Sequence, residues 1–525
     1  MGLDVSQPGV DAPLGSTPNS DNFIMREGSL ELRPALSVRG TNAQPMVARV
    51  LGGTEVVDVT GTRYPLISGT TRLAWYSNTS WSQLSYVSAG GMNDPPAAGE
   101  TDYWDFAQIY NPLIAAAAIA DDNWAIGANA SYQTLFCWQS NTTVFSSLTG
   151  APRAKYVAAF DNYLLAGNIR SGASDFVQRI QWSDRGSASS WTGGLSGFED
   201  LLATKGQITR LLPQENRVIV GMDNEIWHGV PVDFPFVFRF MPLDTSVGMP
   251  YPWTAANTPR GIVFLGRDYQ TYLLPKEGGA AVPIGQRLHR SLRNTIDQPQ
   301  RACAVYDTTY SQYQLYYAIQ GGSGLPQRAV YLNLQEGSWA PQSFDRSGGN
   351  LSLTRGFEAQ FLSSSATSWG GLAAAGVRWA DLNMSWAELA GASGGGGRPS
   401  IHMGSSGGTV YYLNSNATSD NGTAVPAYWQ STALEGLSPA AQKTIREVRI
   451  DYEGTSSSSL TVRVSPNQGG TFDAGTGIAL PTTSGVSQAI AYPFTAARYP
   501  MLRVEVEGQR LRLFRFHVVM QQGGR

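Results

Sequence analysis

The sequence repeats one local pattern, in which a short apolar strand and a second, aromatic-rich strand flank a polar turn of two to six residues. Five copies have turns that begin near residues 161, 222, 266, 307 and 404, and a further copy fits around Val330–Trp339. This spacing is close to the ~40–50 residues of one propeller blade. It predicts an all-β chain whose central part is a β-propeller of about six to eight blades. Because no strict repeat consensus is visible, an all-β chain with irregularly spaced hairpins remains a second interpretation.

Composition and strand pattern divide the chain. With 58 Gly, 29 Pro and 14 Trp among 525 residues, the chain is rich in turns and aromatic strands, and we expect little helix. We expect residues 1–30 to form an extended N-terminal arm and residues 31–424 to form the propeller. After residue 425 the strands, such as Leu502–Glu507, alternate strictly between apolar and charged side chains. Residues 425–525 therefore predict a C-terminal antiparallel β-sandwich.

One segment, residues 364–400, reads as a long Gly/Ala/Trp-rich insertion in the propeller. It holds Trp369, Trp379 and Trp386, followed by the run Gly394–Gly397. One interpretation is a short helix on the propeller rim followed by a linker. The other is an exposed apolar loop that gates a channel or meets another protein, and it makes the three tryptophans candidates for a channel gate or distal contact.

Two segments, Ser465–Phe472 and Trp182–Trp191, resemble the Asp-box turn of sialidase-like propellers. In such a turn a short polar side chain bonds to nearby backbone groups, and glycine supplies a positive φ. We therefore expect both segments to be structural hairpin turns.

The sequence carries no recognisable catalytic motif. The four histidines, His228, His289, His402 and His517, are too widely spaced for a metal-binding motif. A nucleophile elbow, a phosphate loop and a dinucleotide fingerprint are all missing. A glycosidase would need two converging carboxylates, and the sequence identifies no pair among its 40 acidic residues. These features predict no catalytic, metal or cofactor-binding site, and a protein that is not an enzyme.

Charge limits the partners. The formal net charge of −3 disfavours avid binding to nucleic acid or to anionic membranes. Arg287, His289, Arg290 and Arg293 form a local basic cluster, which is either a solvated face or a contact to a neighbouring subunit or phosphate.

Apolar runs fall far short of the ~18 residues that a membrane span needs, so no membrane-spanning segment is expected. Whether Cys137 and Cys303 pair is left open.

Several aromatic and charged segments follow one another in a distinctive order over residues 21–290. They are Asp21–Leu36, Thr71–Tyr76, Tyr103–Gln108, Ala151–Val157, Ile180–Asp184 and Gly261–Asp268. This order resembles the tail nozzle proteins of short-tailed bacteriophages, also called tail tubular protein B or head-to-tail stabilisation proteins. Ala35 stands where that family often has glycine, and the insertion at 364–400 is a second departure.

The resemblance implies a structural virion protein of the phage tail: a hexameric tail nozzle that forms the distal channel, retains DNA and conducts it into the host during ejection. It implies a homo-hexamer that contacts the tail adaptor and portal complex, tail fibres or spikes, and transient duplex DNA in the lumen. A near-neutral chain suits a conduit, because each neutralised phosphate would add affinity for the cargo. The alternative is a glycan-binding or receptor-binding propeller, possibly glycan-cleaving, with a concave acidic cleft and stacked aromatic side chains.

Overall fold

A computed structural model gives the fold. It describes residues 3–4, 16–40, 46, 49–57, 63–70, 72–77, 80–87, 103–110, 123–129, 135–139, 142–148, 150–202, 206–232, 236–344, 351–360, 399–434, 441–454, 458–481, 485–508 and 511–522. Within these residues the chain is built almost wholly from β-strands, and α1 (His289–Thr295) is its one α-helix. The predicted all-β class is confirmed.

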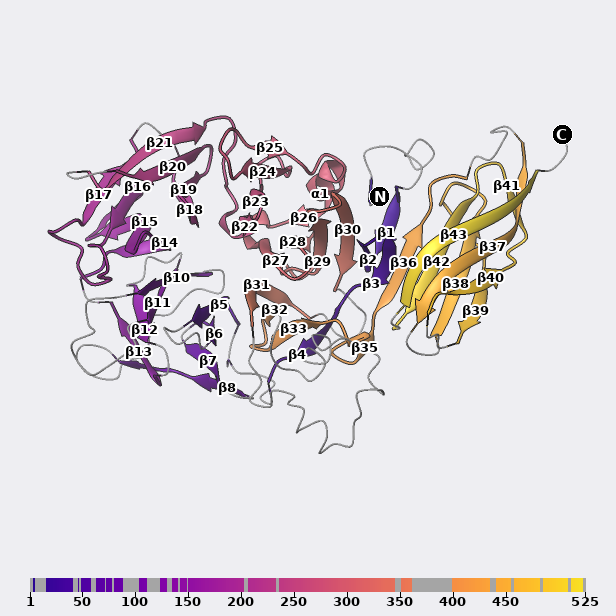
Figure 1. Cartoon of the computed structure of the whole chain (residues 1–525), viewed down its shortest axis with the longest axis horizontal. Helices are drawn as coiled ribbons and strands as arrows, with labels where there is room; N and C mark the ends of the chain where they lie inside the picture. Colours follow the sequence, from indigo (N-terminus) through magenta and orange to yellow (C-terminus); the bar gives the residue numbers. More distant parts are fainter. Residues whose placement is uncertain are drawn as a thin grey trace.

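Among the described residues, seven small sheets surround a common centre (Figure 1). In chain order, the first sheet consists of β5 (Gly52–Val57), β6 (Arg63–Ser68), β7 (Leu73–Ser77) and β8 (Ser80–Gln83). The second consists of β10 (Trp104–Tyr110), β11 (Asn123–Asn129), β12 (Phe136–Gln139) and β13 (Val144–Ser147), and β9 (Ser85–Val87) pairs in parallel with β13. The third consists of β14 (Arg153–Phe160), β15 (Tyr163–Ser171), β16 (Ser174–Trp182) and β17 (Gly197–Asp200), and the fourth of β18 (Ile208–Gln214), β19 (Arg217–Met222), β20 (Ile226–Pro231) and β21 (Phe238–Asp244).

The other three sheets complete the ring. They consist of β22 (Ala256–Thr258), β23 (Gly261–Leu265), β24 (Thr271–Pro275) and β25 (Val282–Pro283); β26 (Ile296–Asp297), β27 (Cys303–Asp307), β28 (Gln312–Ile319), β29 (Arg328–Asn333) and β30 (Ser338–Ser343); and β31 (Leu353–Ala359), β32 (Ser400–Ser405), β33 (Val410–Asn414) and β4 (Ala35–Val38). The first long strands of neighbouring sheets contact one another around the centre, as β5 does β10 and β31 does β5. The result is a seven-bladed propeller, within the predicted range of blades.

The ring is closed by a strand from the beginning of the chain. Strand β4 pairs antiparallel with β33, with Val38 opposite Tyr411 and Ala35 opposite Asn414. The last blade therefore combines three strands from residues 353–414 with one from residues 35–38. This pairing ties the last blade to the beginning of the chain, while each blade keeps the short edges typical of propellers.

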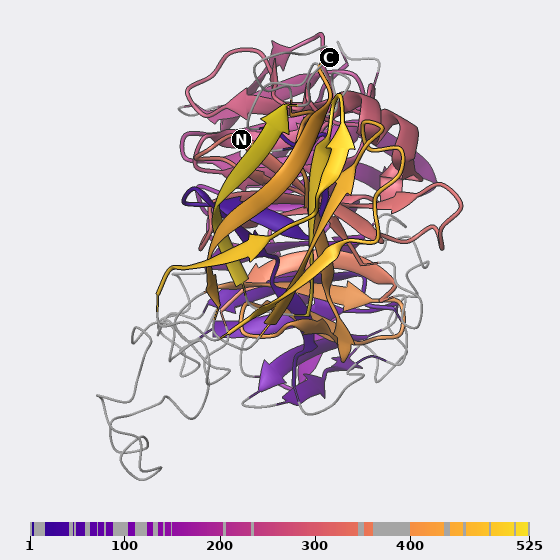
Figure 2. The same ribbon diagram turned by 90° about the vertical axis from the view of Figure 1, so that its right-hand side faces the viewer.

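Two further sheets form a β-sandwich beside the propeller (Figures 1 and 2). One contains β1 (Asn19–Asp21), β36 (Pro426–Gln430), β42 (Met501–Glu507), β38 (Ser458–Ser465) and β39 (Thr476–Leu480). The other contains β2 (Phe23–Arg26), β3 (Ser29–Leu32), β43 (Leu511–Gln522), β37 (Lys443–Gly454) and β40 (Ser487–Ala491), with β41 (Thr495–Ala497) paired to β37. The alternating residues Val448, Ile450, Val462 and Val504 are fully buried between the sheets. A small hairpin, β34 (Ser419–Asp420) with β35 (Thr423–Ala424), precedes the sandwich.

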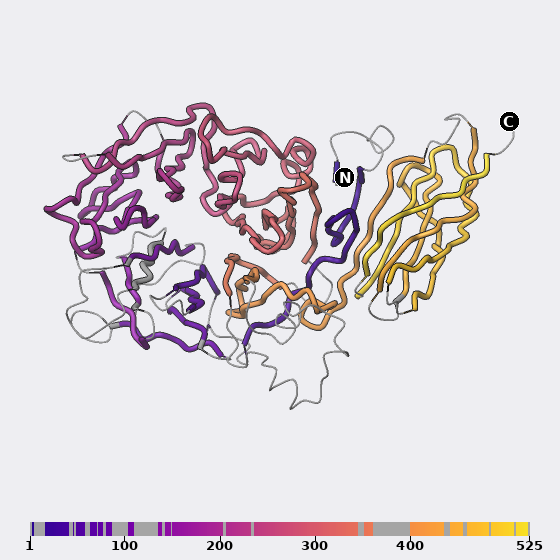
Figure 3. Tube along the Cα trace, viewed as in Figure 1, coloured from indigo at the N-terminus to yellow at the C-terminus, as the bar shows by residue number. Residues whose placement is uncertain are grey.

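The described part of the N-terminal segment is not an extended arm. Strand β1 pairs with β36, and β3 pairs with β43, so residues 19–32 belong to the sandwich. Phe23 and Leu30 are buried in the sandwich core. The Cα trace shows the N-terminal segment running beside the C-terminal strands (Figure 3). The polar composition of residues 1–22 hid the pairing of β1, because this edge strand consists of Asn19, Ser20 and Asp21 and buries no apolar side chain.

The two Asp-box-like segments are structural turns, as predicted. The Asn467 side chain accepts a hydrogen bond from the Thr471 N–H at 2.7 Å and donates one to Thr471 Oγ1 at 2.9 Å. Asp184 Oδ1 accepts from the backbone N–H groups of Arg185 at 2.9 Å and of Leu195 at 3.0 Å. Each polar side chain therefore braces its own loop.

Candidate functional site

The predicted gate residues Trp369, Trp379 and Trp386 lie outside the described residues, as does residue range 361–398. The structure therefore gives them no position.

The predicted basic cluster lies on and just before α1. Arg287 Nε is 3.6 Å from Asp4 Oδ2, and His289 Nε2 is 2.9 Å from the backbone oxygen of Asp268. Arg290 and Arg293 are exposed, and no ion pair joins them to another residue of the described chain. Two of the four residues thus have structural partners, and two remain in solvent.

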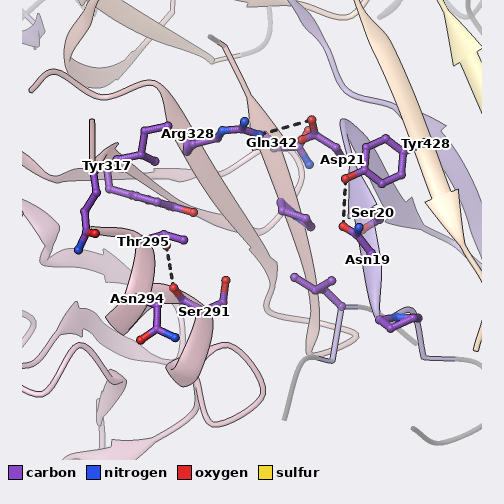
Figure 4. Close-up of a pocket in the computed structure, with 15 residues that line it drawn as sticks. Asn19, Ser20, Asp21, Ser291, Asn294, Thr295, Tyr317, Arg328, Gln342 and Tyr428 are labelled. Atoms are coloured by element: carbon purple, nitrogen blue, oxygen red, sulfur yellow. Dashed lines mark hydrogen bonds and ion pairs between the residues drawn. The ribbon is translucent and has the colours of Figure 1, made fainter. Parts of the chain in front are cut away.

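Next to α1 lies a pocket of about 420 Å³ between the propeller and the sandwich, which we call the junction pocket. Figure 4 shows Ser291 and Asn294 of α1 on one side and Asn19 and Tyr428 on the other. Tyr428 Oη donates to Asn19 Oδ1 at 3.0 Å, and Arg328 Nη1 lies 3.6 Å from Asp21 Oδ2. The remaining lining residues are Leu3, Pro18, Ser20, Thr295, Tyr317, Ile319, Gln320, Pro341 and Gln342. The pocket therefore offers amide, hydroxyl and charged groups to a ligand.

A second site lies at the propeller axis, where the first long strands of the blades begin. We call it the hub cluster: Tyr103, Asp105, Arg210, Trp253, Cys303 and Arg355. Asp105 is the second residue of β10, and Arg210 and Arg355 are each third in β18 and β31. Trp253 and Cys303 stand just before β22 and at the start of β27. Strand ends that converge on one axis bring together residues that are far apart in sequence.

One carboxylate is at the centre of the hub cluster. Asp105 Oδ1 accepts a hydrogen bond from Arg210 Nη1 at 2.7 Å, and its side chain is 4% exposed. Its oxygens also accept from the backbone N–H groups of Phe106 at 3.1 Å and of Val157 at 3.2 Å. These three hydrogen bonds hold the Asp105 carboxylate in place, and its ion pair fixes the position of Arg210.

Two guanidinium groups flank one indole ring. The Arg355 carbon Cζ lies 3.8 Å from the Trp253 ring centroid, and that of Arg210 lies 4.7 Å from it. Arg355 Nη1 also donates to the backbone oxygen of Trp104. Burial, and then the positive charge of Arg210, lower the pKa of Arg355 to about 10. Arg355 is therefore a cation at neutral pH that is held in an unfavourable environment.

Neighbouring groups are neutral. Burial raises the pKa of the Cys303 thiol to about 11, and Cys303 Sγ donates to the Thr354 oxygen at 3.3 Å. Burial also raises the pKa of Tyr103. Cys137 and Cys303 are both free cysteines.

Sequence reasoning missed the hub cluster. Asp105 lies in Tyr103–Gln108, one of the segments that carry the resemblance, but no sequence feature indicates its role, and Arg210, Trp253 and Arg355 carry no signal. Their grouping depends on blade positions that no local spacing encodes.

In the part of the chain that the structure describes, no group of three His, Cys, Asp or Glu side chains is placed to hold a metal. Nor is any described helix long and apolar enough to cross a membrane.

Comparisons with known proteins find similarity among solved structures. No family model and no curated protein matches the chain. Among solved structures, the chain is similar to an exo-β-1,3-galactanase from Phanerochaete chrysosporium, with 11% identity, a TM-score of 0.28 and coverage of 93% of this chain and 100% of the other. It is similar to the Pan2 WD40 domain of Neurospora crassa, with 6% identity, a TM-score of 0.37 and coverage of 75% and 98%. A fungal alcohol oxidase with copper matches at 10% identity, a TM-score of 0.37 and coverage of 90% and 99%.

These matches correct one prediction. The sequence predicted that the chain is not an enzyme, because the usual catalytic motifs are missing. That prediction is corrected: a galactanase and an oxidase are among the similar structures, and missing local motifs do not exclude an enzyme. Catalytic groups in such folds come together from distant strands, and the absence of a local motif does not exclude them.

Proposed function

We propose that this chain is a tail nozzle protein of a short-tailed bacteriophage, and that it works as one subunit of a ring around the DNA channel. The order of segments over residues 21–290 supports the proposal, as given above. The structural observation that carries it is a surface with several exposed apolar side chains on the sandwich, the part of the molecule farthest from β17 (Figure 1).

This surface, which we call the sandwich surface, lies on and around the sheet that contains β37, β40 and β43. Tyr492 and Phe494 are 54% and 61% exposed, and their rings stack with centroids 6.3 Å apart. The other large apolar side chains exposed here are Val486, Ile490, Phe514 and Val519. Apolar patches on a monomer commonly mark contacts with other proteins. A neighbouring subunit that covers this surface would remove these side chains from water.

The test combines particle imaging with variants. We expect the purified chain, mixed with its portal and adaptor complex, to form a six-fold ring. The double variant Tyr492→Ser and Phe494→Ser should fold but fail to join the ring, because its contact surface has lost two aromatic anchors. The matched control is Val282→Ser on β25, which removes an apolar side chain that is 49% exposed outside the sandwich surface. Images with three-fold symmetry or no symmetry would contradict the proposal.

A second candidate function is glycan or receptor binding, and the junction pocket favours it. Its volume of about 420 Å³ and its amide and hydroxyl lining suit a hydroxyl-rich ligand of one or two sugar units. A glycan array with the purified chain would test it. Replacing Asn294 and Gln320 by alanine should abolish array binding, whereas the exposed turn residue Asn216→Ala should leave it unchanged. An array without signal would contradict this candidate.

A further inference from the structure

The hub cluster has more positive charge than its described neighbours compensate. Arg210 and Arg355 share a single nearby carboxylate, Asp105, and only Arg210 is bonded to it. Arg355 forms no ion pair with any residue of the described chain, and its Nη1 donates to the uncharged backbone oxygen of Trp104. A cation removed from water without a counter-charge is costly, and proteins usually pair such groups.

A second observation points the same way. Arg210 Nε is buried and has no hydrogen-bond partner within the described structure. Its Nη1 holds Asp105, so Nε is a further donor on a guanidinium that this ion pair fixes in place. Buried donors are almost always satisfied, by protein, by water or by a ligand. The unmet donor and the unpaired cation belong to arginines that flank the same Trp253 ring.

The surroundings add positive potential. Arg49, Arg301 and Arg355 all act on the Tyr103 hydroxyl electrostatically, and Tyr103 Oη donates to the backbone oxygen of Arg301 at 3.4 Å. Asp105 opposes this field and acts on Arg355 as well as on Arg210, but it is one carboxylate, and Arg210 and two backbone N–H groups are bonded to it. A site of this kind attracts anions and repels cations.

We propose that the propeller axis is a binding site for a single oxyanion group, held by Arg355 and by the free Nε–H of Arg210 next to Trp253. Guanidinium groups match carboxylate, sulfate and phosphate oxygens in geometry, and their charged hydrogen bonds are stronger than neutral ones. The oxyanion is the acid group of a carboxylated sugar or a phosphate group. This inference does not depend on ring assembly or on the junction pocket.

The experiment titrates the purified full chain by calorimetry at pH 7 and constant ionic strength, with chloride as the reference anion. Four probes separate the sources: glucuronic acid, its neutral counterpart glucose, inorganic phosphate and sulfate. We expect at least one acidic probe to bind one per chain, and glucose not to bind. Binding of glucuronic acid alone identifies a carboxylated sugar, and binding of phosphate or sulfate alone identifies an inorganic or phosphoryl group.

Variants tie the binding to the hub. Arg355→Gln removes the unpaired charge and should weaken binding at least ten-fold, while Arg355→Lys keeps the charge and should lose less. The control Arg290→Gln removes an exposed arginine of α1 and should leave affinity unchanged. If Arg355→Gln does not fold, the comparison of Arg355→Lys with Arg290→Gln decides. The proposal is overturned if no acidic probe binds the folded chain, or if binding is equally strong in the Arg355 variants. A ring seen by imaging would not rescue it.

Discussion

Arg33 and Asp420 lie 387 positions apart in the sequence and form a buried ion pair with two hydrogen bonds. Their side chains are 0% and 3% exposed. Arg33 Nε also donates to Asn22 Oδ1 at 2.8 Å, and Nη2 donates to the Ser343 backbone oxygen at 2.9 Å. Asp420 Oδ1 accepts from the Leu36 N–H at 2.8 Å. This one contact therefore ties the segment before β4 to blade six and to the hairpin that leads into the sandwich.

Replacing Asp420 by alanine should destabilise the chain strongly. The change leaves the Arg33 guanidinium buried without its counter-charge, a loss of about 3–5 kcal/mol in the free energy of unfolding. Urea denaturation followed by circular dichroism measures it. The control is Glu215→Ala, which breaks the exposed pair with Lys276, where solvent screens the charges and little change is expected. If both variants lowered the free energy of unfolding equally, the buried ion pair would not stabilise the fold more than an exposed one.

A second prediction distinguishes a sandwich strand from a free arm. Phe23 is 2% exposed and packs in the sandwich core, so Phe23→Ala should lower the free energy of unfolding by about 3–5 kcal/mol. Phe494→Ala, at a site that is 61% exposed, is the matched control and should have a small effect. Thermal denaturation of both variants tests this. An unchanged melting temperature in Phe23→Ala would mean that the N-terminal segment does not stabilise the sandwich.

Because of the Asp307 carboxyl, we expect the free energy of unfolding to rise when the pH is lowered mildly. Burial raises its pKa to about 6, above the value near 3.8 of an unperturbed aspartate. Between these two values the folded chain binds a proton that the unfolded chain does not, so the free energy of unfolding falls as pH increases through this window. Asp307→Asn should be more stable than the native chain at pH 7.5, by about 1–3 kcal/mol.

The measurement is a series of urea denaturation curves from pH 4 to pH 8. The difference between Asp307→Asn and the native chain should become small near pH 4, where the folded carboxyl is protonated and the unfolded one, with a pKa near 3.8, is partly protonated. Asp451→Asn, on the sandwich, serves as the control and should not reproduce this pattern. A constant difference at all pH values would contradict the prediction.

His402 predicts the opposite trend. Its ring is fully buried, Nε2 accepts from Arg39 Nε at 3.2 Å, and Nδ1 is 2.9 Å from the Ser400 oxygen. Burial, and then the charge of Arg39, lower the pKa of His402 well below its usual 6.5. Below about pH 6.5, His402 is protonated in the unfolded chain but stays neutral in the folded chain. The free energy of unfolding therefore falls as the pH falls.

His402→Gln should remove that loss, because an amide can accept from Arg39 and donate to Ser400 without titrating. The same denaturation series, run between pH 7 and pH 4.5, compares it with the control His289→Gln. We expect a shallower decline in His402→Gln by up to about 1.4 kcal/mol per pH unit. If both variants decline as the native chain does, His402 does not govern acid stability.

The sequence by itself determined the class of structure and the two kinds of strand. Hairpins such as Tyr156–Gly167 are local, because the turn and both strands lie within a few residues. The turn at Asn467 could be predicted for the same reason, since the hydrogen bonds of Asn467 stay within residues 465–471. Alternation in Leu502–Glu507 marked a half-buried strand through its period of two.

Only the tertiary structure decided how the ends meet and where the hub lies. Strand β1 pairs with β36 across more than four hundred residues, and β4 completes a blade with β33. Such pairings depend on the global ring, and no local periodicity encodes them. Asp105, Arg210 and Arg355 meet because each stands near the start of a first long strand, and the strands converge on one axis. Their sequence neighbourhoods differ, so the cluster exists only once the propeller has closed.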